Sequence, residues 1–171
     1  KDYSYAICIY LSFLLSKMSD RGSSLCSWDS SRDGIRNTFG RQAIPMVWNF
    51  AEGNPFCNSS GSLNNMLEWV VKCIEQFPAS VNGYSMQFDA QSDIGLRGIM
   101  VSTDPPYYDN VGYADLSDFF YVWLRQALFD ICPELFRTML VPKAEELVAT
   151  PNRFEGNIEK TRQFFEDGML K

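Results

Sequence analysis

An acid, two prolines and an aromatic ring stand together in Asp104-Pro105-Pro106-Tyr107, directly after the apolar run Ile99-Met100-Val101. The segments Tyr84–Phe88 and Gly98–Ser102 have the composition of strands, so the motif is predicted to follow the carboxyl end of a strand. Open α/β sheets bind their ligands at the carboxyl ends of strands. The sequence therefore indicates Asp104, Pro105, Pro106 and Tyr107 as the candidate catalytic residues.

These residue types favour the binding of a planar amine. The Asp104 carboxylate and the Pro105 carbonyl can accept the two hydrogens of an NH2 group, which localises the nitrogen lone pair. Pro105 has no backbone N–H and Pro106 has a fixed φ, so the carbonyl is held with little entropy to lose. Tyr107 offers a ring face on which a base can stack. Taken alone, the same four residues are also typical of a rigid turn after a strand.

Composition excludes several classes of chemistry. The chain of 171 residues contains no histidine, so Ser-His-Asp triads and histidine-based zinc sites are ruled out. Its five cysteines show no C-x-x-C spacing and their number is odd, which predicts no metal site and favours reduced thiols in the cytoplasm. The net charge of −6 provides no overall positive field to hold a nucleic acid.

Helical periodicity dominates the first half of the chain. Apolar spacing predicts a helix over residues 3–18, buried on most sides, a short helix over Arg41–Glu52, and a third helix through Phe77 with Ser62 as its N-cap. Ser19–Thr38 is expected to be a long loop. The apolar stretch Tyr5–Leu15 is far shorter than the ~20 residues that cross a bilayer, so no membrane association is expected.

The second half is predicted to combine the two strands with two helices. An amphipathic helix follows the proline motif, is capped by Asp115 or Ser117 and ends before Pro133, and a last helix spans Ile158–Leu170. Trp48, Phe119, Phe120 and Trp123 are expected in the core. Residues 1–80 then form a helical segment and residues 81–171 an α/β catalytic segment of one compact unit.

The proline motif also resembles a known family. Asp104-Pro105-Pro106-Tyr107 is similar to the D-P-P-Y motif of S-adenosylmethionine-dependent amino-methyltransferases, and the longer stretches Thr103–Tyr121 and Arg36–Trp48 resemble a family of large adenine-specific DNA methylases that carry a zinc ribbon. The resemblance implies a partial Rossmann-like α/β methyltransferase domain with a helix-rich N-terminal half. It further implies S-adenosylmethionine as cofactor and DNA as partner, with adenine N6 as methyl acceptor.

The resemblance extends to the binding residues. It implies that Asp89 and Ala90, at the end of the first predicted strand, bind the cofactor together with Asp104 at the end of the second. It also implies that the target base is bound by residues after the prolines, namely Tyr107, Tyr108, Asn110 and Tyr113. For Asp89 alone, an acid that caps a turn is an equally good interpretation, and Tyr113 can equally be a core aromatic residue.

No glycine-rich cofactor loop of the F-x-G-x-G kind is present, so the chain is expected to be a fragment that is inactive in isolation. Other planar amines, namely cytosine N4, an RNA base or a protein glutamine, are alternative acceptors. A non-catalytic scaffold or interaction fragment is the alternative from a different class.

Overall fold

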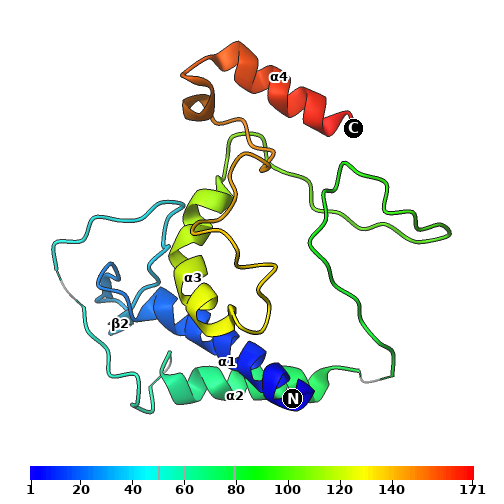
Figure 1. The fold of residues 1–171 in the computed structure, drawn as a ribbon. Coiled ribbons are helices and arrows are strands. Elements are labelled where there is room, and N and C mark those ends of the chain that lie inside the picture. Colours follow the sequence, from blue (N-terminus) through cyan, green and yellow to red (C-terminus); the bar gives the residue numbers. More distant parts are fainter. Residues whose placement is uncertain (50, 60, 79) are drawn as a thin grey trace. The chain divides into compact units, whose positions relative to one another are not determined.

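The structure, a computed structural model, describes residues 1–49, 51–59, 61–78 and 80–171 (Figure 1). In chain order, the regular elements of these residues are α1 (Asp2–Arg21), β1 (Trp28–Asp29), β2 (Gly34–Ile35), α2 (Leu63–Gln76), α3 (Tyr113–Leu128), the 3₁₀ turn η1 (Pro151–Phe154) and α4 (Ile158–Met169). The chain divides into two compact units. Unit 1 comprises Lys1–Pro78 and Asp115–Val141, and unit 2 comprises Ala79–Ala114 and Pro142–Lys171.

The predicted α/β fold class is wrong. The regular elements of the described residues are mostly helices, and their sheet is the antiparallel pair β1–β2, in which Trp28 lies opposite Ile35 and Asp29 opposite Gly34. Neither 84–88 nor 98–102 forms a strand, and Figure 1 shows residues 80–112 as a long trace without helix or strand. No parallel, Rossmann-like sheet is present in the described part of the chain.

The physical reason is that β-branched and apolar composition does not by itself make a strand. A strand is stabilised by a neighbour that accepts and donates its backbone hydrogen bonds and by burial of one face. Tyr84 is 88% exposed and Met100 is 96% exposed, so these two runs have neither pairing nor burial. The strand prediction failed because it rested on side-chain types without any evidence of a pairing partner.

Two helices of the N-terminal half pack against each other in unit 1. α2 begins as predicted, because the Ser62 hydroxyl accepts a hydrogen bond from the Asn65 backbone N–H at 3.3 Å. α1 contacts α2 and is longer than the predicted helix. Its expected burial is wrong: only Ser12 and Leu14 are buried among its described residues, while Tyr3 is 80% exposed.

The core of unit 1 forms around α3, the predicted amphipathic helix, which begins at Tyr113 and so before the predicted caps Asp115 and Ser117. Tyr121 and Leu128 of this helix are buried with Phe136, and the Tyr121 and Phe136 rings lie 5.5 Å apart. Phe119 and Phe120 are partly buried and both contact the ring of Phe39. The core prediction is wrong for two tryptophans: Trp123 is exposed and Trp48 is 87% exposed.

The segment between α1 and α2 is held by a small buried polar cluster. Thr38 is fully buried, and both its backbone N–H and its hydroxyl donate to the carbonyl of Asp20 at 2.7 Å. The Cys26 thiol donates to the same carbonyl at 3.3 Å. The predicted helix over 41–52 does not form in the described residues of that range. One of its apolar positions, Phe50, lies outside the described residues.

Unit 2 is built around α4, which confirms the predicted last helix. Asn157 caps this helix by accepting a hydrogen bond from the Lys160 backbone N–H at 2.9 Å. Val148 and Ala149 are buried, and Gly168 of α4 lies directly against the side chain of Leu147. The loop 142–150 therefore packs closely on the last helix.

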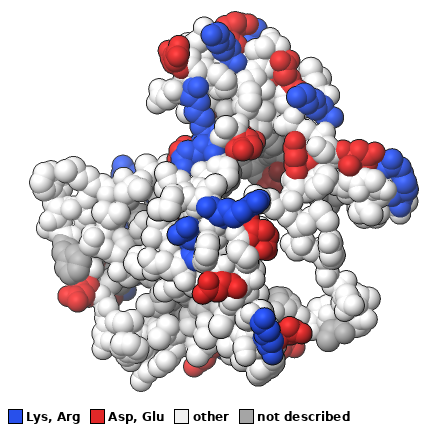
Figure 2. Space-filling view, in the orientation of Figure 1, with Lys and Arg blue, Asp and Glu red and all other residues white. Residues whose placement is uncertain are grey.

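Among the described residues, no helix is both long enough and apolar enough to cross a membrane. On the face shown in Figure 2, basic and acidic side chains are interspersed, with no broad patch of one sign.

Candidate functional site

Two of the candidate catalytic residues are in direct contact. The Tyr107 hydroxyl donates a hydrogen bond of 2.6 Å to Asp104 Oδ1, and both side chains are exposed. This hydrogen bond, followed by the charge of the carboxylate, raises the pKa of the Tyr107 hydroxyl above its ordinary value. The three-residue spacing across Pro105 and Pro106 thus folds the acid and the phenol onto each other in a short, exposed loop.

A tight turn fixes the residues that follow. The Asn110 backbone N–H donates to the Tyr107 carbonyl at 3.1 Å, and Tyr108 between them has a left-handed φ of 57°. A bulky residue rarely adopts this conformation, so the surrounding contacts must hold it. The Tyr108 carbonyl accepts from the Ala149 N–H at 2.9 Å, and its ring packs edge-on against Phe165 at 5.1 Å.

Tyr113 is the first residue of α3 and is 58% exposed, so the core alternative for this residue is wrong. Its phenol makes the smallest of the contributions that raise the pKa of Tyr107. The four residues predicted to bind a base, Tyr107, Tyr108, Asn110 and Tyr113, are therefore gathered around one turn and the helix start that follows it.

The predicted cofactor residues are not gathered with them. Asp89 Oδ1 accepts a hydrogen bond from the Gln91 backbone N–H at 3.0 Å, and the Asp89 carbonyl accepts from Ser92. Both Asp89 and Ala90 are exposed. Asp89 therefore caps a turn, as the alternative interpretation predicted. The parallel strands that were expected to place Asp89 beside Asp104 do not form in the described residues.

These residues do not fit S-adenosylmethionine as they stand. A cofactor of this size needs a site that covers most of its surface, whereas Asp89, Ala90 and Asp104 are exposed loop residues. The carboxylate of Asp89 is also already engaged with its own turn. The described residues therefore supply acceptor groups without an enclosing cofactor site.

Two residues that stabilise the segment after this turn, Glu146 and Arg153, were not identified from the sequence. Glu146 Oε1 accepts a hydrogen bond from the Ala114 backbone N–H at 2.9 Å, and Glu146 Oε2 lies 2.8 Å from Arg153 Nη2. The other guanidinium nitrogen of Arg153 donates to the Lys143 carbonyl at 2.8 Å. In the sequence, Glu146 belongs to the charged run Lys143–Glu146, which resembles any solvated loop, so no local signal distinguishes it.

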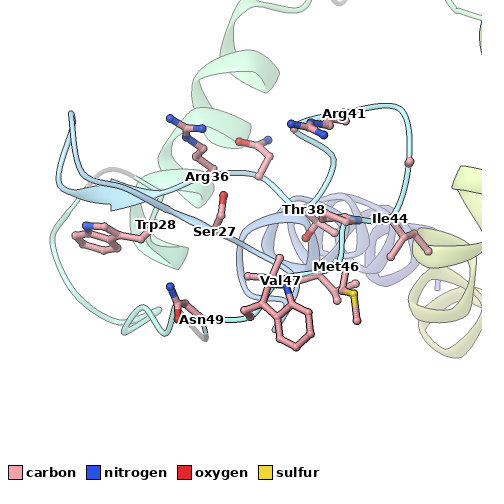
Figure 3. A pocket seen from close by; sticks show the side chains of 15 residues that line it. Ser27, Trp28, Arg36, Thr38, Arg41, Ile44, Met46, Val47 and Asn49 are labelled. Carbon is pink, nitrogen blue, oxygen red and sulfur yellow. The ribbon is translucent and has the colours of Figure 1, made fainter.

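Unit 1 contains a separate open cavity of about 730 Å³ (Figure 3). Its walls come from the loop segments 25–28 and 36–49, which include Arg36, Arg41, Trp28 and Trp48. The backbone that forms it is anchored by the buried Thr38. Neither composition nor periodicity identifies this cavity, because it depends on how the loop is folded.

No family model, no curated protein and no solved structure matches this chain. In the described part of the chain, no three potential metal-ligating side chains of the His, Cys, Asp or Glu type are clustered.

Proposed function

We propose that this chain supplies the amine-binding segment of an S-adenosylmethionine-dependent DNA methyltransferase that acts on adenine N6. The observation that carries the proposal is the 2.6 Å hydrogen bond from Tyr107 to Asp104, which holds an exposed carboxylate next to two prolines and an aromatic ring. The similarity of Asp104-Pro105-Pro106-Tyr107 to the D-P-P-Y motif adds the reaction class.

The residues of the segment have separate roles in binding the amine. A carboxylate offers about four acceptor positions, so Asp104 can accept from Tyr107 and from an amine hydrogen at the same time. The Pro105 carbonyl accepts the second amine hydrogen. With both hydrogens engaged, the lone pair of the amine is less delocalised into the ring and is directed out of its plane. Pro106 restricts the backbone that aims the carbonyl.

The target base is bound by the aromatic residues around the turn. Tyr107 is 52% exposed and Tyr113 is 58% exposed, so both present ring surface to solvent. A base turned out of a duplex loses stacking with its neighbours, and an aromatic ring partly replaces that interaction. Asn110 adds an amide that can bind a base edge.

S-adenosylmethionine supplies the methyl group in this proposal. Because Asp89, Ala90 and Asp104 do not enclose it, the proposal includes further polypeptide that completes the cofactor site, and the chain alone is expected to be inactive. The five cysteines of the chain are free thiols, which favours a cytoplasmic protein. DNA is the proposed partner. In this proposal it binds the chain together with the further polypeptide that completes the cofactor site.

A non-catalytic interaction fragment is the second candidate function. It is favoured by the exposed apolar side chains of residues 80–112, among which Tyr84 is 88% and Met100 96% exposed. Surfaces of this kind are commonly covered by a partner. In this alternative the two prolines only shape a loop.

The two candidates are separated by methyl transfer from labelled S-adenosylmethionine to DNA, measured with the longest polypeptide that contains this chain. Oligonucleotides whose only amine-bearing base is adenine are expected to be methylated, and those whose only amine-bearing base is cytosine are not. Asp104→Ala is expected to lower the rate by at least about a hundredfold, whereas Asp130→Ala, an exposed acid after α3, retains it. Equal rates in both variants contradict the proposed role of Asp104.

A further inference from the structure

The lining of the cavity in unit 1 contains basic but no acidic side chains. Its wall segments 25–28 and 36–49 contain two arginines and no acidic residue, although the whole chain has a net charge of −6. Among the described lining residues, the positive groups are Arg36, which is paired with Asp29, and Arg41. A local excess of guanidinium groups attracts anions, and phosphate most strongly because its oxygens match the geometry of the guanidinium.

Arg36 is held in place by the β1–β2 hairpin. Its Nε lies 3.2 Å from Asp29 Oδ2, and its backbone N–H donates to the Ser27 carbonyl at 2.9 Å. Hydrogen bonds from Ser31 and then from Arg36 lower the pKa of Asp29 to about 2, so this carboxylate stays charged at neutral pH. The Asp29 carboxylate therefore pairs with Nε of the Arg36 guanidinium.

The remaining wall is apolar and aromatic. Ile44, Met46 and Val47 line the cavity with Trp28 and Trp48, and the two tryptophans are 54% and 87% exposed. In the view of Figure 3, Arg36 and Arg41 lie in the upper part, and Met46 and Val47 lie below them. The lining therefore combines guanidinium groups with apolar and aromatic side chains.

We infer that this cavity binds a nucleotide, with the phosphate at Arg36 and Arg41 and the base against the exposed tryptophan surface. A volume of about 730 Å³ lies within the range of pockets that hold small ligands. Stacking of a base on an aromatic ring and pairing of phosphate with arginine are the two interactions that nucleotide-binding sites use together. The inference concerns unit 1 alone and does not depend on methyl transfer by Asp104.

The shared chemistry, a base joined to a phosphate, occurs in free nucleotides and in single-stranded nucleic acid. Tryptophan fluorescence of the intact chain is therefore titrated with four probes: adenosine 5′-monophosphate, adenosine, inorganic phosphate and a short single-stranded oligodeoxynucleotide. Saturable quenching is expected with the monophosphate, at least about tenfold tighter than with adenosine or phosphate alone. Tighter binding of the oligonucleotide identifies single-stranded nucleic acid as the source, and tighter binding of the monophosphate identifies a free nucleotide.

Matched variants locate the site. Arg41→Gln is expected to weaken binding of the monophosphate about tenfold, whereas Arg137→Gln, an exposed arginine outside the cavity, leaves it unchanged. Trp48→Ala is expected to weaken binding and Trp69→Ala, an exposed tryptophan of α2, is not. Circular dichroism of each variant checks that it is folded. Absence of saturable binding by the wild-type chain, or equal loss in Arg41→Gln and Arg137→Gln, overturns the inference.

Discussion

Glu146 and Arg153 form a half-buried ion pair in which Oε2 and Nη2 lie 2.8 Å apart, with side chains that are 18% and 20% exposed. The other oxygen of Glu146 accepts the Ala114 backbone N–H near the start of α3. One carboxylate thus joins the loop 142–150 to the segment that follows the proline motif. Replacing Glu146 removes the acceptor of the Ala114 N–H and one of the acceptors of Arg153, which also donates to the Lys143 carbonyl.

We expect Glu146→Ala to destabilise the chain by about 1–3 kcal/mol, because it leaves both the Ala114 N–H and the Arg153 guanidinium without this acceptor. Glu146→Gln keeps one acceptor and is expected to cost less. Guanidinium unfolding measures the change, and Glu145→Ala, the exposed neighbour, is the control. Equal stability of the two alanine variants contradicts the role of Glu146.

The contact between Tyr107 and Asp104 predicts an ionisation that can be observed directly. The carboxylate raises the pKa of Tyr107, so the hydrogen bond is present at and below the ordinary tyrosine pKa of 10.0 and is lost as the pH rises through the higher value of the folded chain. In Asp104→Asn this pKa is expected to fall toward 10.0. Carbon-13 NMR of labelled tyrosine, assigned with Tyr107→Phe, measures it.

The control for this titration is Asp109→Asn. Asp109 is a charged residue two positions after Tyr107, and it does not take part in the hydrogen bond between Tyr107 and Asp104. It is expected to shift the Tyr107 titration much less than Asp104→Asn. A Tyr107 pKa that is the same in the wild type and in Asp104→Asn contradicts the observed contact.

The hairpin β1–β2 predicts a stability change in acid. The pKa of Asp29 is lowered from its ordinary 3.8 to about 2, first by the Ser31 hydroxyl and then by Arg36. The stabilisation is therefore complete above pH 3.8 and is lost as the pH falls through about 2. NMR of the Trp28 indole N–H, assigned with Trp28→Phe, follows the hairpin.

In Asp29→Asn this acid-dependent step is expected to be lost, because the amide does not titrate. Asp33→Asn changes an acid of the same hairpin turn that does not contact Arg36, and it is expected to retain the step. Identical acid titrations of Trp28 in the wild type and in Asp29→Asn contradict this account.

For the substitution Gly168→Ala, we expect the cost of packing to outweigh the gain in helix propensity. Alanine in a helix is favoured over glycine by about 1 kcal/mol, but a Cβ at position 168 meets three side-chain atoms of Leu147 at once. Gly168→Ala is expected to be destabilising by about 1–3 kcal/mol, because the whole Leu147 side chain must move. Thermal unfolding measures it, and the double variant with Leu147→Ala is expected to recover the propensity gain relative to Leu147→Ala alone.

The helices α2 and α4 were predictable because their signals are local. Ser62 before an apolar stripe, and Ile158–Leu170 as a separate amphipathic run, specify α2 and α4 within a few residues of sequence. The close contact of Asp104 with Tyr107 is also local, since three residues with two prolines between them determine it.

The remaining features depend on contacts between distant segments. The runs 84–88 and 98–102 contain strand-forming residues but lack a pairing neighbour, and Trp48 has an apolar side chain but lies in a loop that does not become a helix. Glu146 acts on Ala114 across 32 positions of sequence. Neither composition nor periodicity contains this information, because both describe one segment at a time.

Tyr108 contacts the last helix and directly follows Tyr107, whose hydroxyl donates to Asp104. Its strained left-handed backbone is held by Ala149 on the carbonyl side and by the Phe165 ring of α4 on the side-chain side. A molecule that displaces α4 also removes the Phe165 ring from Tyr108, and with it a support of the residue next to Tyr107. Displacement of the C-terminal helix is therefore one way in which binding far from the proline motif in sequence can weaken the hydrogen bond between Tyr107 and Asp104.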